Sequence, residues 1–253
     1  MKDPRSILIT GASSGIGEAL AHAYAGPGVF LALTGRDRER LAAVADAVRA
    51  KGAEVEAEAL DTTDRAAMAG WLQRIDSFRP LDLVVANAGV GLEGDRKLPE
   101  EEAMRGTFAV NVDGVLNTVL PLLPALRARR RGQIAVMASL ASFVGLPQAA
   151  AYNGSKAAVR IWGESLRLIL RRNGIGVSVI CPGFVVSRMT ARNRFPMPFL
   201  MSAEKAAGII VRGLAGNRAR IAFPFGTRAA VWLGATLPAG WTDRLLRLVS
   251  VPR

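Results

Sequence analysis

Short runs of consecutive apolar residues alternate along this chain with longer segments in which apolar residues recur every three or four positions. The short runs are typical of strands buried on both faces of a sheet, and the longer segments of helices with one apolar face. Strands are expected at 6–10, 29–34, 54–60, 81–86, 133–138, 175–181 and 220–223. Helices are expected between them, at about 15–25, 37–51, 63–78, 99–130, 152–172 and 203–215. The alternation predicts one α/β domain, a doubly wound parallel sheet of about seven strands with helices on both faces.

Polar and proline residues mark where several of these elements begin or bend. Asp37 and the stretch 61–64 precede predicted helices, and their carboxylates are expected to cap the first-turn amides. Pro121 and Pro124 fall inside the helix predicted over 99–130, so we expect that segment to be either one kinked helix or a broken pair.

Composition narrows the classes of function. The 253 residues carry a formal net charge of +12, mostly from Arg, which suggests an anionic partner such as nucleic acid, a lipid surface or a phosphorylated cofactor, or only a solvated basic surface. The single cysteine, Cys181, excludes an internal disulfide and a cysteine-based zinc site, and no metal is expected. The single histidine, His22, lies in a predicted helix, which argues against a Ser-His-Asp hydrolase. Without a visible signal peptide, a cytoplasmic location is expected.

A glycine-rich turn joins the first predicted strand to the first helix, where residues 10–17 read TGASSGIG. Glycines let the backbone turn tightly and approach a ligand, and the start of a helix favours a pyrophosphate. The sequence therefore predicts a Rossmann-like fold and a dinucleotide site here. Its expected contacts are Gly11, Ser13, Ser14, Gly15, Ile16 and Gly17.

The end of the second predicted strand bears on which dinucleotide is bound. Sites that prefer NAD(H) usually have a carboxylate here to hold the ribose hydroxyls, but this chain has Gly35 followed by Arg36. A guanidinium pairs well with a 2′-phosphate. We therefore predict NADP(H) over NAD(H), with NAD(H) as the alternative; Asp37, the signal for NAD(H), is assigned to the helix cap.

Tyr152 and Lys156 are four residues apart in a predicted helix, so their side chains share one face. An ammonium favours the phenolate, and Lys156 is expected to lower the pKa of Tyr152, making a tuned proton donor and acceptor. Gly154 between them costs about 1 kcal/mol of helix stability relative to alanine and predicts a close neighbour.

These motifs, in this order, resemble those of the short-chain dehydrogenase/reductase family over about residues 5–190. The matches are the turn at 10–17, Asp61 after the third strand, Asn87, Ala88 and Gly89 after the fourth, then Asn111, Ser139, Tyr152 and Lys156, and finally Pro182 and Gly183 followed by Val185 and Ser187.

The resemblance implies reversible hydride transfer between a nicotinamide and a carbonyl or alcohol carbon. It implies that Tyr152 protonates the substrate oxygen, that Ser139 hydrogen-bonds it, that Lys156 holds the nicotinamide ribose and that Asn111 positions a water. It also implies that the cofactor contacts, beyond the glycine turn and Arg36, are Asp61, Asn87, Ala88, Gly89, Tyr152, Lys156, Pro182, Gly183, Val185 and Ser187.

The substrate is expected to be a hydrophobic carbonyl or alcohol, because the candidate pocket residues are mostly apolar. Residues 188–201, rich in Pro, Phe and Met, are interpreted with the helix to about 215 as an insertion over the site. The pocket candidates are Val90, Leu92, Phe143, Leu146, Gln148, Phe184, Met189, Phe195, Met197 and Phe199.

Two other interpretations concern the partners of the chain. Residues 221–253 mix apolar and basic side chains, and packing on the body or on a second subunit is favoured over contact with a membrane surface. The resemblance implies a homodimer or homotetramer. The sequence lacks a nucleic-acid recognition motif, so no nucleic-acid partner is expected. Alternative functions are a cofactor-sensing protein without turnover, or an epimerase or dehydratase on the same fold.

Overall fold

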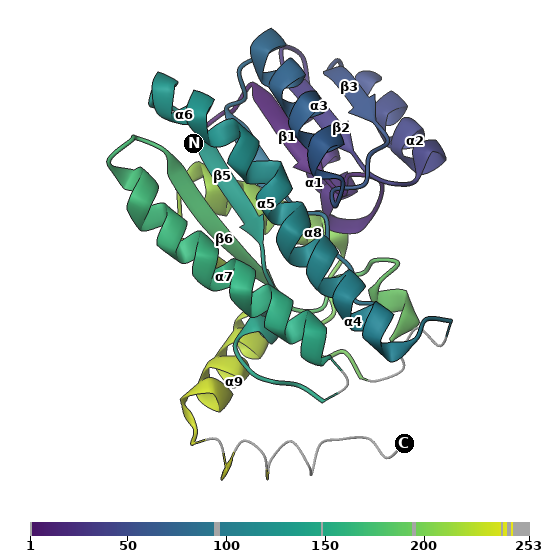
Figure 1. Cartoon of the computed structure of the whole chain (residues 1–253), viewed down its shortest axis with the longest axis vertical. Coiled ribbons are helices and arrows are strands. Elements are labelled where there is room, and N and C mark those ends of the chain that lie inside the picture. Colours follow the sequence, from purple (N-terminus) through teal and green to yellow (C-terminus); the bar gives the residue numbers. More distant parts are fainter. Residues whose placement is uncertain are drawn as a thin grey trace.

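Seven parallel strands form one sheet in the order β3-β2-β1-β4-β5-β6-β7 (Figure 1). The computed structural model describes residues 2–93, 97–147, 149–193, 196–238, 240–241 and 244. The strands are β1 (Ser6–Thr10), β2 (Phe30–Thr34), β3 (Glu54–Glu58), β4 (Leu83–Ala86), β5 (Gln133–Met137), β6 (Gly176–Pro182) and β7 (Arg220–Phe223). The predicted fold, a single α/β domain with a doubly wound parallel sheet, is confirmed.

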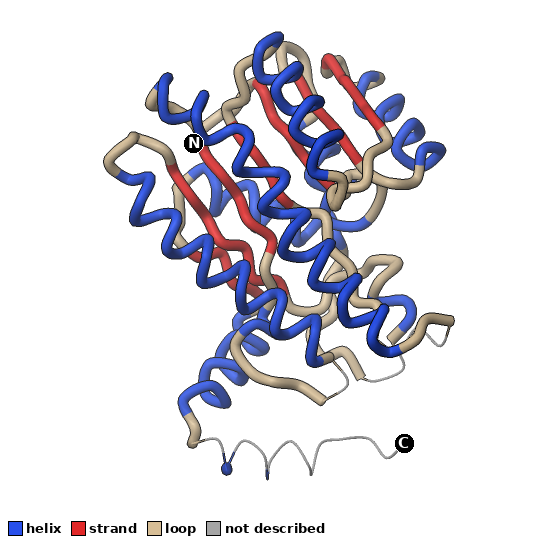
Figure 2. The backbone as a smooth tube through the Cα atoms, in the orientation of Figure 1, coloured by secondary structure: helices blue, strands red, loops and turns tan. Residues whose placement is uncertain are grey.

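Helices cover both faces of the sheet (Figures 1 and 2). Side chains of a strand alternate between faces, so Ile7 and Ile9 of β1 join one hydrophobic core and Leu8 joins the other. On the first face lie α1 (Gly15–Tyr24), α2 (Arg38–Arg49) and α8 (Ala203–Ala215); on the second lie α3 (Arg65–Phe78), α5 (Gly114–Val119), α6 (Leu123–Arg129) and α7 (Ala150–Arg171).

Two helices begin at the aspartates that the sequence suggested. Asp37 Oδ1 accepts a hydrogen bond of 3.0 Å from the backbone N–H of Arg40, and Asp64 Oδ1 accepts one of 3.0 Å from that of Ala67. Each carboxylate satisfies an amide that has no partner inside its helix. Asp37 is therefore a helix cap, as predicted.

The segment predicted as one long helix or a broken pair is a continuous helical run that changes its hydrogen-bonding pattern. α4 (Glu100–Phe108) passes through a π-helical turn, Ala109–Asp113, into α5, and a 3-10 turn at Leu120–Leu122, which contains Pro121, leads into α6. Within the described residues this run alone is long and apolar enough to cross a membrane, but half of its most apolar window is buried, as in a core helix.

The region after β6 differs from the expected insertion. α8 packs on α1, with Ala206, Ala207 and Ile210 buried in the first core, so it is a core helix and not part of a lid. The interpretation of 203–215 as insertion is wrong because these residues supply an apolar face that the sheet requires. What remains is the 186–200 segment, whose two ends are joined by a bridge between Val185 and Met201.

The strand order creates a crevice where the connections leave β1 and β4 in opposite directions. In open parallel sheets, ligands bind outside the carboxyl ends of the strands at such a point. The glycine turn follows β1, residues 87–89 follow β4, Ser139 follows β5 and Gly183 follows β6, so the fold gathers every predicted motif at this edge.

Candidate functional site

The glycine turn is packed so tightly that side chains would not fit. Gly11 has a φ of +67°, and a Cβ there would lie 2.9 Å from the Cα of Ala88. A Cβ on Gly17 would lie 2.2 Å from the carbonyl oxygen of Gly11. Ser14, at the N-cap of α1, makes no side-chain capping bond, which leaves the first amides of the helix to a ligand. These features fit the pyrophosphate of a dinucleotide.

Asn87 holds the glycine turn in place. Its Nδ2 donates to the carbonyl oxygens of Thr10, at 2.9 Å, and Gly11, at 3.3 Å. In return, Thr10 Oγ1 accepts from the backbone N–H groups of Asn87 and Ala88, both at 3.1 Å. The side chain of Asn87 therefore joins the ends of β1 and β4, and its contribution to a cofactor site is structural.

The predicted selectivity residues lie at the ends of β2 and β3. A Cβ on Gly35 would lie 2.9 Å from Ser13 Oγ, so only glycine leaves this side of the turn open. Arg36 is exposed, and its Nη1 lies 3.9 Å from Asp61 Oδ2, while Asp61 Oδ1 accepts from the backbone N–H and the hydroxyl of Thr63. The guanidinium of Arg36, next in sequence to Gly35, which contacts Ser13, fits a phosphate group.

The structure brings together the four residues predicted to be catalytic. Lys156 Nζ lies 6.0 Å from the ring centroid of Tyr152 and donates a 2.9 Å hydrogen bond to the carbonyl oxygen of Met137 at the end of β5. The side chain of Ser139 acts to lower the pKa of Tyr152, so the two groups lie near each other. A Cβ on Gly89 would lie 2.9 Å from Lys156 Nζ and 3.0 Å from Asn111 Oδ1, so these atoms surround the turn after β4.

The acid–base properties of the pair differ from the expectation. Burial raises the pKa of Tyr152, and the side chain of Ser139 acts in the opposite direction but is the smaller effect. The spacing to Lys156 predicted a lowered pKa for Tyr152, but its pKa is raised, because burial destabilises the phenolate more than Ser139 stabilises it. Burial also lowers the pKa of Lys156 to about 8. At neutral pH, Tyr152 is therefore a protonated donor.

Asn111 lies in the π-helical turn and is completely buried. Its Oδ1 accepts from the backbone N–H of Val90 at 2.8 Å, and its Nδ2 donates to the carbonyl oxygen of Val90 at 2.9 Å and to Ser155 Oγ at 3.0 Å. π-helical turns occur often at functional sites, where they redirect a side chain. Here the amide fastens the loop after β4 to α7.

Glu93 is a residue of the site that the sequence did not suggest. Its Oε1 and Oε2 accept 2.7 Å hydrogen bonds from the backbone N–H groups of Ala151 and Tyr152, in the first turn of α7. The N-cap residue of α7 is Ala149, which has no capping side chain. The carboxylate comes from a loop 58 residues away in sequence, so no local signal could have revealed it.

The motif after β6 completes the crevice. Ser139 Oγ donates to the carbonyl oxygen of Pro182 at 3.4 Å, and Gly183 N–H donates to that of Phe223 at 2.7 Å. Gly15 has a φ of +59°, and a Cβ there would lie 3.2 Å from the Cβ of Ser187. Ser187 thus faces the glycine turn. The side chain of Val185 is buried in the core, which leaves only its backbone for a cofactor.

The predicted pocket residues separate into those at the crevice and those elsewhere. A Cβ on Gly91 would lie 3.5 Å from Tyr152 Cδ2 and 3.9 Å from Met189 Sδ, so Met189 and Tyr152 both lie beside Gly91. Leu92 instead packs on Gly106 of α4. Phe143 stacks under the guanidinium groups of Arg160 and Arg220, 4.2 and 5.1 Å from its ring centroid, and lines a separate cavity with Leu140 and Trp232. Gln148 and Phe195 lie outside the described residues.

Gly154 in α7 has the close neighbour that the sequence predicted. A Cβ at this position would lie 3.2 Å from Cζ of Phe108, at the end of α4. The contact lets α4 approach α7 between Tyr152 and Lys156.

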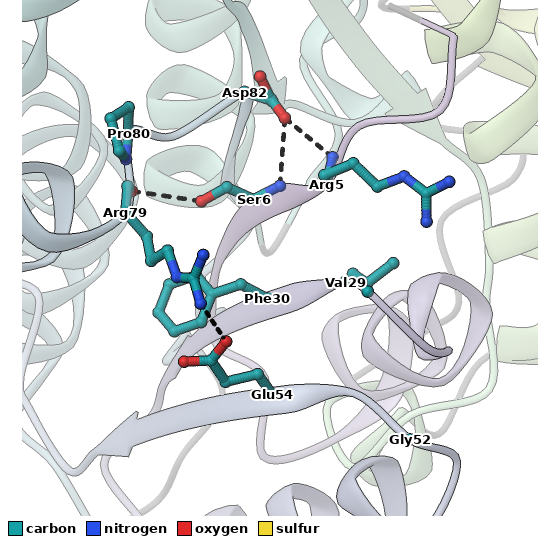
Figure 3. A pocket seen from close by; sticks show the side chains of 10 residues that line it. Arg5, Ser6, Val29, Phe30, Gly52, Glu54, Arg79, Pro80 and Asp82 are labelled. Carbon is teal, nitrogen blue, oxygen red and sulfur yellow. Dashed lines mark hydrogen bonds and ion pairs between the residues drawn. The ribbon is translucent and has the colours of Figure 1, made fainter.

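A cavity of about 390 Å³ lies at the amino-terminal edge of the sheet (Figure 3). Its polar lining residues interact with one another. Asp82 accepts hydrogen bonds from the backbone N–H groups of Arg5 and Ser6, and Arg79 forms an ion pair with Glu54 (Figure 3). These contacts tie strand starts together and assign the cavity a structural role.

The fold and the site together define a Rossmann-type oxidoreductase, and comparisons with known proteins agree. A family model described as short chain dehydrogenase matches residues 5–196. An uncharacterized oxidoreductase of Myxococcus xanthus is 40% identical over 244 residues, which are 96% of each protein. The chain therefore belongs to the short-chain dehydrogenase family.

Two solved structures are similar over nearly the whole chain. A short-chain dehydrogenase from Sphingobium yanoikuyae in complex with NADPH is 25% identical, with a TM-score of 0.80, and the match covers 98% of this chain and 96% of that one. A short-chain dehydrogenase/reductase from Burkholderia phymatum in complex with NAD is 27% identical, with a TM-score of 0.82 and coverage of 98% and 97%.

Proposed function

We propose that this enzyme transfers a hydride between NADP(H) and a hydrophobic carbonyl compound or secondary alcohol. The observation that carries the proposal is the convergence of Ser139, Tyr152 and Lys156 on one crevice beside the glycine turn. A bound nicotinamide dinucleotide supplies or accepts the hydride. The protein binds and orients the reactants and moves the proton.

In the direction of reduction, Tyr152 donates the proton that the substrate oxygen acquires. Its raised pKa keeps the phenol protonated at neutral pH. Ser139, beside Tyr152, would turn its hydroxyl from the carbonyl oxygen of Pro182 to the same substrate oxygen and stabilise the charge that develops there. Lys156, turned toward Met137 in this arrangement, would hold the ribose of the cofactor.

The test of this function is the Tyr152→Phe variant. Loss of general acid catalysis is expected to lower kcat for NADPH-dependent reduction at least about 100-fold, while the Kd for NADPH stays within about twofold. The assay follows NADPH oxidation over a panel of steroid, acyl, sugar and quinone carbonyls. A variant that turned over at the wild-type rate would disprove the assignment, and binding without turnover in the wild type would favour a cofactor sensor.

The preference for NADP(H) is supported by Arg36 and by the absence of a carboxylate at Gly35. Of the two similar solved structures described above, one holds NADPH and the other holds NAD. We expect Arg36→Ala to raise the Kd for NADPH about tenfold, since a charged hydrogen bond at an exposed site is lost, and to leave that for NADH within about twofold. Equal changes for both cofactors would contradict the preference.

The remaining expectations are also proposals. Met189, which lies beside Gly91 as Tyr152 does, supports an apolar substrate, and a panel that favoured small charged keto acids would refute it. An epimerase or dehydratase would act without net NADPH consumption, which the same assay detects. A cytoplasmic homodimer or homotetramer is the expected form, to be tested by fractionation and light scattering.

A further inference from the structure

Helix α9 (Phe225–Thr236) follows β7 and has no buried residue, although it is almost entirely apolar. Phe225, Trp232 and Leu233 are 73%, 65% and 60% exposed, and Trp241 beyond the helix is 65% exposed. Val231 packs against the core cluster that contains Val179 and Cys181, whereas large apolar side chains left exposed on a helix are normally covered by protein or by lipid. Contiguous apolar surface of this kind marks an interaction site.

The charge of the same segment favours an anionic partner. Arg228 lies within α9, Arg244 is exposed beyond it, and the described residues from 224 to 241 include no acidic side chain. By sequence, residues 224–253 contain four arginines and one aspartate, a side-chain charge of +3. Arg228 stacks on Phe225, with its guanidinium carbon 5.1 Å from the ring centroid, and has no carboxylate partner among the described residues.

The position of α9 connects this surface to the catalytic edge. Figure 1 shows α9 projecting from the end of the molecule opposite α6. A cavity of about 460 Å³ lies beneath it, lined by Leu140, Phe143, Ala222 and Trp232, and Leu140 directly follows Ser139. A Cβ on Gly226, at the start of α9, would lie 2.9 Å from the ring of Phe199 in the 186–200 segment. A partner on α9 would therefore lie next to the crevice.

We propose that α9 docks the enzyme on an anionic lipid bilayer. Tryptophan prefers the interface between lipid and water, where its ring is apolar and its N–H is hydrated, and arginine binds anionic headgroups. Twelve residues of helix span about 18 Å, too short to cross about 30 Å of hydrocarbon, so α9 lies on the surface. Nucleic acid would leave the exposed tryptophan and leucine side chains without a partner, and pairing with a second copy would bring like charges together.

The test measures binding of the full-length protein to vesicles. Sedimentation with phosphatidylcholine vesicles, and with vesicles containing about 30% phosphatidylglycerol, separates charge from apolar partitioning. We expect strong binding to the anionic vesicles, weak binding to the neutral ones, and a blue shift of tryptophan emission on binding. Trp71 is buried in the core and contributes no shift.

Two charge-reversal variants control for the high net charge. Arg228→Glu and Arg127→Glu both lower the charge by two, but Arg127 lies at the exposed end of α6. Arg228→Glu is expected to weaken binding about 30-fold and Arg127→Glu less than about threefold. Trp232→Ala should remove most of the blue shift.

Three results would overturn the proposal. The first is an equal loss of vesicle binding in the two arginine variants, which would mean non-specific attraction. The second is the absence of binding to anionic vesicles. The third is a blue shift that depends on protein concentration without lipid, which would assign α9 to contact with a second copy of the chain. None of these measurements uses enzymatic activity, so failure here leaves the proposed function untouched.

Discussion

Replacing Glu93 by alanine removes the carboxylate that caps the first turn of α7, the helix that carries Tyr152. Two hydrogen bonds of 2.7 Å are lost, to the N–H groups of Ala151 and of Tyr152 itself. Hydrogen bonds to charged groups contribute about 1.5–3 kcal/mol, and losing a helix cap costs about 0.5–2 kcal/mol. Glu93 is half-buried, so water replaces part of what is lost. We expect about 1–2 kcal/mol of destabilisation, a fall in Tm of about 2–8 °C.

The larger consequence of Glu93→Ala is for catalysis. Freeing the backbone of Tyr152 lets its hydroxyl move relative to Ser139, and misplacement of a reacting group by about 1 Å costs up to about 100-fold in rate. We therefore expect kcat for NADPH-dependent reduction to fall about 10- to 100-fold. The Kd for NADPH should change less than about threefold, because the glycine turn lies on α1, remote from the cap.

Matched variants distinguish a positioning role from general destabilisation. Glu93→Gln keeps one acceptor oxygen and should recover much of kcat, whereas Glu93→Asp is too short to reach and should resemble alanine. Glu101→Ala removes an exposed carboxylate paired with Arg105 and should change neither kcat nor Tm measurably. If Glu93→Ala had wild-type kcat, or if kcat and NADPH affinity fell together, Glu93 would not position Tyr152.

Three further predictions follow from buried charged or titratable groups. Because burial lowers the pKa of Lys156 to about 8, the native state releases this proton at lower pH than the unfolded chain, so its contribution to stability rises between about pH 8 and 10.5. Urea unfolding at pH 7.5 and 9.5 should show this rise in the wild type relative to Lys156→Met; an unchanged difference would contradict it. Cys181 is completely buried, and burial raises the pKa of its thiol to about 12. Thiol reagents should therefore react with it only as fast as the protein opens. Rapid labelling of the native protein would refute this prediction. Asp76→Ala breaks a bidentate ion pair with Arg129, whose two hydrogen bonds are 2.7 and 2.8 Å long. This should lower the free energy of unfolding by about 3 kcal/mol and the Tm by about 6–12 °C in calorimetry. A fall in Tm of less than about 2 °C would contradict the prediction.

The sequence by itself determined the fold and the position of each motif along the chain. Continuous apolar runs require burial on both faces, which parallel strands with helices between them provide, and short capping motifs such as Asp37 are read locally. These features depend on residues within a few positions of one another, and a single sequence records such patterns well.

Only the tertiary structure decided the features that depend on contacts between residues far apart in the sequence. Glu93 caps a helix that begins 58 residues away, and the π-helical turn directs the Asn111 amide to its hydrogen bonds with Val90 and Ser155. The pKa of Tyr152 also follows from tertiary burial, which reversed an expectation based on the spacing to Lys156. The exposure of α9 in the single chain also follows from the fold, since its composition does not show which side chains the sheet covers. Burial and long-range contact are properties of the assembled layers, and no local pattern encodes them.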